Sequence, residues 1–130
     1  MLGCVGRIAH SILLVDDDDD LRDLLTDSLH QRGYAVFEAR DGREALRVLD
    51  AITPHAIVLD LMMPAMDGFA FLAARAARAE LGAIPVVIAS GLPPRENLAA
   101  SLWNEFLAKP YDVQALVDAI ERLCRVHGSP

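Results

Sequence analysis

Five side chains suited to metal or phosphate chemistry each stand at the end of a short apolar segment. Asp16 and Asp17 follow SILLV (11–15), and Asp60 ends HAIVLD (55–60). Ser90 ends IPVVIAS (84–90), and Lys109 follows EFLA (105–108). Carboxylates are the hard oxygen ligands that Mg²⁺ prefers, and a hydroxyl and an ammonium can balance charge on a phosphoryl group. This chemistry requires a fold that brings all five side chains to one place.

Asp16 and Asp17 begin a run of five aspartates, and carboxylates so close together repel one another. Such a run is usually a solvated charge block, but here an apolar segment precedes it and a leucine-rich helical pattern follows it. Its last three members lie where that helix begins, where carboxylates can cap free N–H groups and favour the positive end of the helix dipole. We therefore predict that Asp16 and Asp17 belong to the site and that Asp19 is the N-cap.

Strand and helix patterns alternate along the whole chain. Apolar runs predict strands over 11–15, 34–39, 55–60, 84–90 and 105–108. Helical patterns predict helices from Asp19 to Gly33 and over 41–52, 67–81, 94–103 and 112–124. This alternation is typical of an α/β doubly wound fold, a parallel sheet covered by helices on both faces.

The predicted sheet explains how distant residues could meet. The carboxyl ends of parallel strands share one edge, where ligands bind near the point at which strand order reverses. With five strands in the order 2-1-3-4-5, Asp16, Asp17 and Asp60 meet across adjacent strands 1 and 3. Ser90 then lies next to them, with Lys109 beyond.

Composition limits the classes of protein to consider. The 130 residues are 53% hydrophobic and 24% charged, which predicts one globular domain. The formal net charge of −7 argues against direct nucleic-acid binding by this domain. No apolar run reaches membrane-spanning length, and MLGCVGRIAH is a poor signal peptide. Two cysteines near opposite ends favour a reduced, cytoplasmic setting over a disulfide framework.

The motifs ILLVDDD, VLDLMMPAMDG, VVIAS and LAKP resemble those of the receiver domain of two-component response regulators. The resemblance runs over nearly the whole chain in matching order and spacing. It implies a flavodoxin-like (βα)5 sandwich over residues 11–126, with an N-terminal extension (1–10) and a tail or linker start (127–130). It also implies a signalling phosphoacceptor in a phosphorelay rather than a turnover enzyme, with a histidine kinase or histidine phosphotransfer protein as partner.

The resemblance implies a role for each residue of the acidic site. Asp60 matches the phosphoacceptor, and Asp16 and Asp17 match the pair that holds Mg²⁺. Asp17 and Asp60 would bind the ion directly and Asp16 through water, with the backbone carbonyl of Met62 as a further ligand. Lys109 matches the site lysine.

The resemblance also implies a conformational switch. Ser90 matches the switch hydroxyl, and Phe106 matches the switch aromatic, although by itself Phe106 reads as a core residue. The peptide bond before Pro110 is expected to be cis. Phosphorylation would change the face made by helix 4, strand 5 and helix 5, but the segment GLPPRENLAASLWNEFLA departs from the family pattern there. We expect a shortened fourth helix and self-association that is weak or depends on phosphorylation.

Two other functions stay open. One is a receiver-like protein-interaction module that is not phosphorylated. The other is an aspartate-nucleophile phosphatase of the haloacid dehalogenase type, because Asp16-x-Asp18 after a strand resembles its first motif. That class places a threonine two residues after the second aspartate, where this chain has Asp20. The sequence does not reveal an output domain, which could be attached or separate.

Overall fold

Five parallel strands form a single sheet in the order β2-β1-β3-β4-β5, as predicted. The computed structural model describes residues 10–64, 66–94 and 98–127. The strands are β1 (Ser11–Val15), β2 (Ala35–Ala39), β3 (Ala56–Leu59), β4 (Val86–Ser90) and β5 (Glu105–Ala108). The helices are α1 (Asp19–Gln31), α2 (Gly42–Ala51), α3 (Gly68–Ala76), α4 (Ala79–Gly82), the 3₁₀ helix η2 (Ala100–Leu102) and α5 (Val113–His127).

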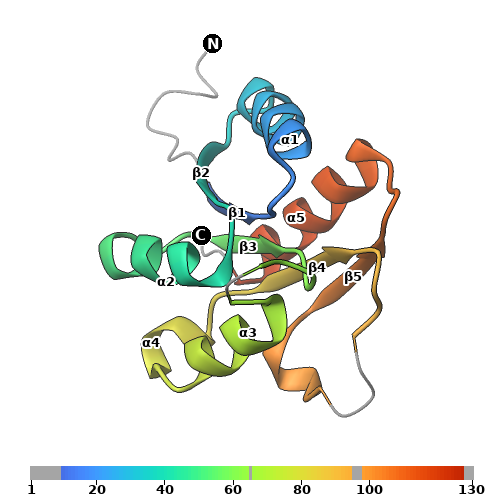
Figure 1. Cartoon of the computed structure of the whole chain (residues 1–130). Helices are drawn as coiled ribbons and strands as arrows, with labels where there is room; N and C mark the ends of the chain where they lie inside the picture. Colours follow the sequence, from blue (N-terminus) through green and yellow to red (C-terminus); the bar gives the residue numbers. More distant parts are fainter. Residues whose placement is uncertain (1–9, 65, 95–97, 128–130) are drawn as a thin grey trace.

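Helices cover both faces of the sheet, with α1 and α5 on one face and α2, α3 and α4 on the other (Figure 1). Alternate residues of the three central strands point to opposite faces, and both sets are buried. In β1, for example, Leu13 and Val15 pack in the cluster with α2 and α3, whereas Ile12 and Leu14 pack in the cluster with α1 and α5. Burial on both faces explains why these strands read as continuous apolar runs.

The N-cap of the first helix is one residue earlier than predicted, so α1 begins at Asp19 and not at the residue after it. Asp18, not Asp19, is the N-cap, and its Oδ1 accepts a hydrogen bond of 3.1 Å from the Leu21 amide. Asp19 is the first helical residue, and its carboxylate pairs with Arg22 instead. At the other end Gly33 has φ +91°, a conformation that glycine adopts without strain.

The predicted helix over 67–81 is divided in two. α3 ends at Ala76, and the single turn α4 follows at Ala79. The cause lies in the buried Arg75, whose guanidinium donates to the carbonyl oxygens of Gly82 and Ile84. A straight helix would carry these carbonyl groups away from Arg75, so the chain turns back at residues 77–78.

The predicted helix over 94–103 is not found in the described part of that range. Residues 95–97 lie outside the described residues, and residues 98–103 contain only the 3₁₀ turn η2. The Leu102 carbonyl oxygen accepts from Arg75 at 3.2 Å, and the Asn104 side chain accepts from the Val86 amide at 2.7 Å. These contacts fix residues 102 and 104 against the sheet and α3.

The predicted domain limits are only partly covered by the structure. Of the predicted extension over 1–10, only His10 is described, and residues 128–130 of the predicted tail are outside the described range. Within the described residues, every helix is too short or too polar to cross a bilayer.

Candidate phosphoacceptor and metal site

The register of the parallel strands brings the predicted site residues together. Val15 is paired with Leu59, and Leu59 with Ile88, so the residues after β1 and β3 emerge side by side. The Asp60 amide donates to the Val15 carbonyl oxygen at 2.9 Å. The Lys109 amide donates to the Ser90 carbonyl oxygen at 2.9 Å, and the bond between Lys109 and Pro110 is cis, as expected.

Asp60 lies at the centre of the site and accepts three hydrogen bonds. Its Oδ1 accepts from the Ser90 hydroxyl at 2.8 Å and from the Met62 amide at 3.1 Å. Its Oδ2 lies 3.1 Å from the Lys109 ammonium, which also lies 2.8 Å from Oδ2 of Asp16. Lys109 is the only lysine of the chain, and it joins the two buried carboxylates.

Burial and the neighbouring charges shift the pKa values of Asp16 and Lys109 in opposite directions. Asp16, Asp60 and Ser90 are all buried. Burial raises the pKa of the Asp16 carboxyl above its usual value, against the opposing effects of the bonds from Lys109 and the Asp18 amide. Burial alone would lower the pKa of the Lys109 ammonium, but the hydrogen bonds and charges of the two aspartates outweigh it and raise that pKa.

The three carboxylates form a group that fits a hard divalent cation. One oxygen from each of Asp16, Asp17 and Asp60 lies within 4.8 Å of the others. Asp17 is exposed, and its carboxylate makes no hydrogen bond to another described residue, so its oxygens are free for a ligand. Mg²⁺ usually combines one or two carboxylates with retained waters, and an open group with one exposed member allows this.

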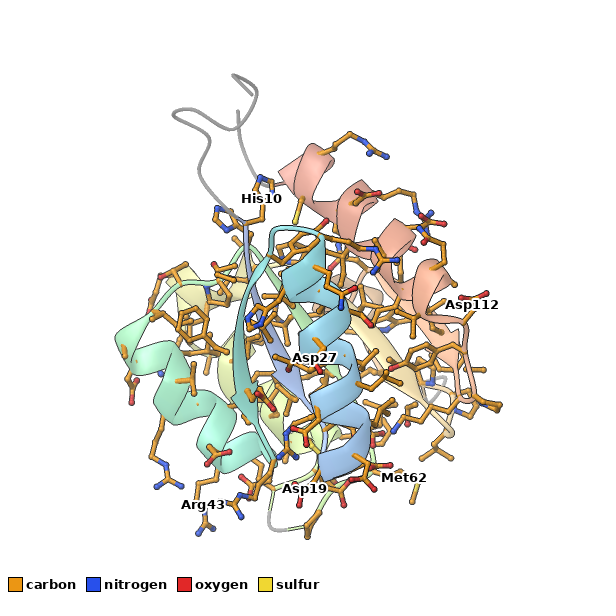
Figure 2. All side chains as sticks on the ribbon, turned by 90° about the horizontal axis from the view of Figure 1, so that it is seen from above. His10, Asp19, Asp27, Arg43, Met62 and Asp112 are labelled. Atoms are coloured by element: carbon orange, nitrogen blue, oxygen red, sulfur yellow. The ribbon has the colours of Figure 1, made fainter. Side chains whose placement is uncertain are left out.

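A shallow, largely apolar cleft of about 350 Å³ lies beside Asp17. Two of its lining residues are exposed large hydrophobic side chains, Met62 at 60% and Leu92 at 37%. Figure 2 shows Met62 at the same end of the molecule as Asp19, with His10 at the opposite end. The cleft beside Asp17 is therefore lined by apolar as well as acidic side chains.

The predicted switch residues lie on adjacent strands. Ser90 ends β4, and its hydroxyl oxygen accepts from the Leu92 amide at 3.2 Å while it donates to Asp60. Phe106 is opposite Ile88 in the β4–β5 register and packs, half-buried, against the cluster of α2 and α3. Ser90 thus links the acidic site to the following loop, and Phe106 lies in the neighbouring strand.

One residue of this region was not identified from the sequence. Arg22 of α1 donates to the Asp16 backbone carbonyl oxygen at 2.7 Å, beside the acidic pair. Its guanidinium also contacts Asp19 and Glu38, and Glu38 belongs to β2, the one strand for which no site residue was predicted. The spacing of Asp19 and Arg22 indicates a helical ion pair. Nothing in the sequence indicates the backbone contact.

Comparisons with known proteins agree with this geometry. The family model described as response regulator receiver domain matches residues 12–121. The chain is 34% identical over 116 residues to the "Uncharacterized 14.6 kDa protein in sodA1 3'region" of Leptolyngbya boryana, covering 87% of this chain and 88% of the relative. It is 36% identical over 127 residues to the transcriptional regulatory protein PrrA of Mycobacterium tuberculosis, covering 95% of this chain. The match spans 54% of PrrA, so this chain corresponds to about half of that regulator.

A solved structure gives the same result. The signal receiver domain of a signal transduction histidine kinase from Syntrophus aciditrophicus superposes with a TM-score of 0.81 at 31% identity. That match covers 91% of this chain and 92% of the other. The sheet order, the acidic group at the sheet edge and these matches lead to one conclusion: the chain belongs to the response regulator receiver domain family.

Proposed function

We propose that Asp60 is the phosphoacceptor of this receiver domain and takes a phosphoryl group from a phosphohistidine partner. The observation that carries the proposal is the set of three donors on Asp60: the Lys109 ammonium, the Ser90 hydroxyl and the Met62 amide. These donors hold one carboxylate in a fixed orientation at the sheet edge. They are also placed to stabilise a phosphoryl group attached there, the two neutral donors through hydrogen bonds and Lys109 through its charge.

The reaction requires no group beyond those at the site, the donor and the cation. A carboxylate oxygen of Asp60 attacks the phosphorus, a new P–O bond forms, and the P–N bond to the partner's imidazole breaks. The imidazole nitrogen keeps the electron pair, and Lys109 offsets the charge on the transferring group. Mg²⁺, held by Asp17 and Asp60 directly and by Asp16 through water, would neutralise phosphoryl oxygens, with the Met62 carbonyl as a further ligand.

The remaining assignments follow from the family. The partner is a histidine kinase or a histidine phosphotransfer protein, in the cytoplasm, and the domain acts as a signalling acceptor rather than a turnover enzyme. Ser90 and Phe106 transmit the modification to the face that includes β5 and α5. The output domain is attached or separate, and this domain does not contact nucleic acid or membrane itself.

Intact mass spectrometry tests this function. The protein is treated with acetyl phosphate and Mg²⁺, and wild type should gain one phosphoryl group. Asp60→Asn should gain none, because the nucleophile is gone, and Asp17→Asn should need more Mg²⁺. If wild type gains nothing under conditions that phosphorylate another receiver domain, the chain is an interaction module and the proposal is wrong.

A further inference from the structure

Arg22 connects three segments of the chain at the edge of the acidic site. It lies one turn into α1, and its side chain is only 14% exposed. Nη1 donates to the Asp16 backbone carbonyl oxygen at 2.7 Å, and Nη2 donates to Asp19 at 2.7 Å. Nε donates to Glu38 of β2 at 3.2 Å. All three nitrogens of one planar guanidinium are therefore used, which a lysine could not reproduce.

The contact with Asp16 is to the peptide that leads into Asp17. The Asp16 amide donates to the Ala39 carbonyl oxygen at 3.1 Å, and the Asp16 side chain is held by the Asp18 amide and by Lys109. Arg22 supplies the donor for the remaining group, the carbonyl. The Asp17 carboxylate has no described partner, so the orientation of this peptide is the main contact-based constraint on where the Asp17 side chain begins.

We propose that Arg22 is a positioning residue for the metal site: it holds the Asp16–Asp17 peptide so that the Asp17 carboxylate faces Asp60. The inference rests on the proposed function, because it assumes that the carboxylates bind Mg²⁺. Arg22 does not touch the ion in this account. Asp19 and Glu38 accept hydrogen bonds from the guanidinium and so fix its orientation. Hydrogen-bond partners of a metal ligand fix the orientation of that ligand in a similar way.

Charge and geometry predict opposite effects of removing Arg22, which makes the inference testable. A cation near the site repels Mg²⁺, so its loss would strengthen Mg²⁺ binding if charge were its only contribution. Loss of the carbonyl contact would instead free the peptide and weaken binding. We expect geometry to dominate, because the contact with the Asp16 carbonyl oxygen is direct at 2.7 Å, whereas the effect of the guanidinium's charge on the ion is screened by solvent and salt.

Calorimetric titration of the whole chain with MgCl₂ measures this effect directly. Arg22→Met, which keeps an unbranched apolar stem but removes the guanidinium, should raise the Mg²⁺ dissociation constant by about 10-fold. Arg22→Lys keeps the charge and can reach one acceptor, so its constant should lie between those of wild type and Arg22→Met. Arg122→Met is the matched control, because Arg122 pairs with Glu105, which begins β5 at the opposite end of that strand from Lys109, and should leave the constant unchanged.

The phosphorylation rate shows whether Arg22 positions the metal site or takes part in phosphoryl transfer itself. At saturating Mg²⁺, Arg22→Met should reach nearly the wild-type rate with acetyl phosphate, because the bound ion itself orders Asp17. Unchanged or tighter Mg²⁺ binding by Arg22→Met, with the fold intact by circular dichroism, would overturn the inference. If Arg22→Met does not fold, binding by Arg22→Lys equal to wild type would overturn it. Failure of wild type to bind Mg²⁺ would instead contradict the proposed function.

Discussion

The Ser90 hydroxyl lies 2.8 Å from Oδ1 of Asp60 and donates a hydrogen bond to it. The Ser90 hydroxyl oxygen also accepts a hydrogen bond of 3.2 Å from the Leu92 amide, so this one atom connects the proposed phosphoacceptor to the loop after β4. A phosphoryl group on Asp60 would take the place of the carboxylate as acceptor. The Ser90 hydroxyl would have to move to reach it, and the loop would follow.

Replacing Ser90 should therefore separate phosphorylation from its response. Ser90→Ala should still be phosphorylated, because Asp60 and Lys109 remain, but the loop should no longer respond. Hydrogen exchange of the Gly91 and Leu92 amides should slow when beryllofluoride is added to wild type and to Ser90→Thr, which keeps the hydroxyl. An equal slowing in Ser90→Ala would show that the loop is controlled by another contact.

The exposed apolar side chains beside the site should prolong the phosphorylated state. Hydrolysis requires a water molecule in line with the phosphorus, and neither Met62 nor Leu92 can hydrogen-bond such a water. The double variant Met62→Asn, Leu92→Glu should lose the phosphoryl group faster, as followed by intact mass over time. Phe37→Asn is the control, since Phe37 is an exposed apolar residue of β2. Equal decay in wild type and the double variant would contradict this role.

Arg75 should contribute strongly to stability although it has no carboxylate partner among the described residues. Its guanidinium donates to the carbonyl oxygens of Leu102, Gly82 and Ile84, and burial lowers its pKa. Arg75→Ala would leave these carbonyl groups without donors and open a cavity, so we expect a loss of about 3 kcal/mol in urea unfolding.

The neighbouring Arg78 provides the matched control for Arg75. It is partly exposed and pairs with Asp50 and Glu80, so Arg78→Ala should cost less than about 1 kcal/mol. Similar losses for the two variants would mean that the three carbonyl contacts of Arg75 do not stabilise the fold.

Stability should fall as the pH rises from about 10 to about 12. Burial raises the pKa of both tyrosines, Tyr34 and Tyr111, from 10.0 to about 12. The unfolded chain loses these protons first, so the neutral phenols stabilise the fold fully below pH 10, and this contribution is lost as the pH rises through 12.

A double variant tests this pH dependence. Tyr34→Phe, Tyr111→Phe should show a smaller loss of unfolding free energy between pH 8 and pH 11 (~3 pH units that bracket the ordinary phenol pKa). At neutral pH the change at Tyr111 should cost little, because its buried hydroxyl has no hydrogen-bond partner among the described residues. An identical pH dependence in wild type and the double variant would refute the assignment.

The sheet and most of the acidic site could be predicted because both depend on local sequence patterns. Apolar runs on buried parallel strands end at the sheet edge, so the residues after them, such as Asp60 and Ser90, must lie near one another. The cap at Asp18 differed from the predicted Asp19 because adjacent aspartates have the same capping ability. Only the backbone conformation decides between them.

The roles of Arg75, which is buried, and of Arg22, which is largely buried, could not be predicted. Arg22 and Arg75 both donate to backbone carbonyl oxygens outside their own helices, and a carbonyl group carries no sequence signal. Arg75 also donates to carbonyl oxygens beyond the end of α3 and to that of Leu102, and neither the helix predicted over 67–81 nor the described part of the one predicted over 94–103 forms as a single helix. Tertiary contacts of a single side chain outweighed the local helical pattern.

The position of the phosphoryl group tests the central proposal most directly. Wild type is treated with acetyl phosphate and Mg²⁺, reduced with borohydride, which converts an aspartyl phosphate to homoserine, and analysed by peptide mass spectrometry. We predict homoserine at position 60 and unmodified aspartate at 16 and 17, with no homoserine in Asp60→Asn. Homoserine at Asp16, the position of the nucleophile in a phosphatase of the haloacid dehalogenase type, would contradict the assignment of Asp60 as phosphoacceptor.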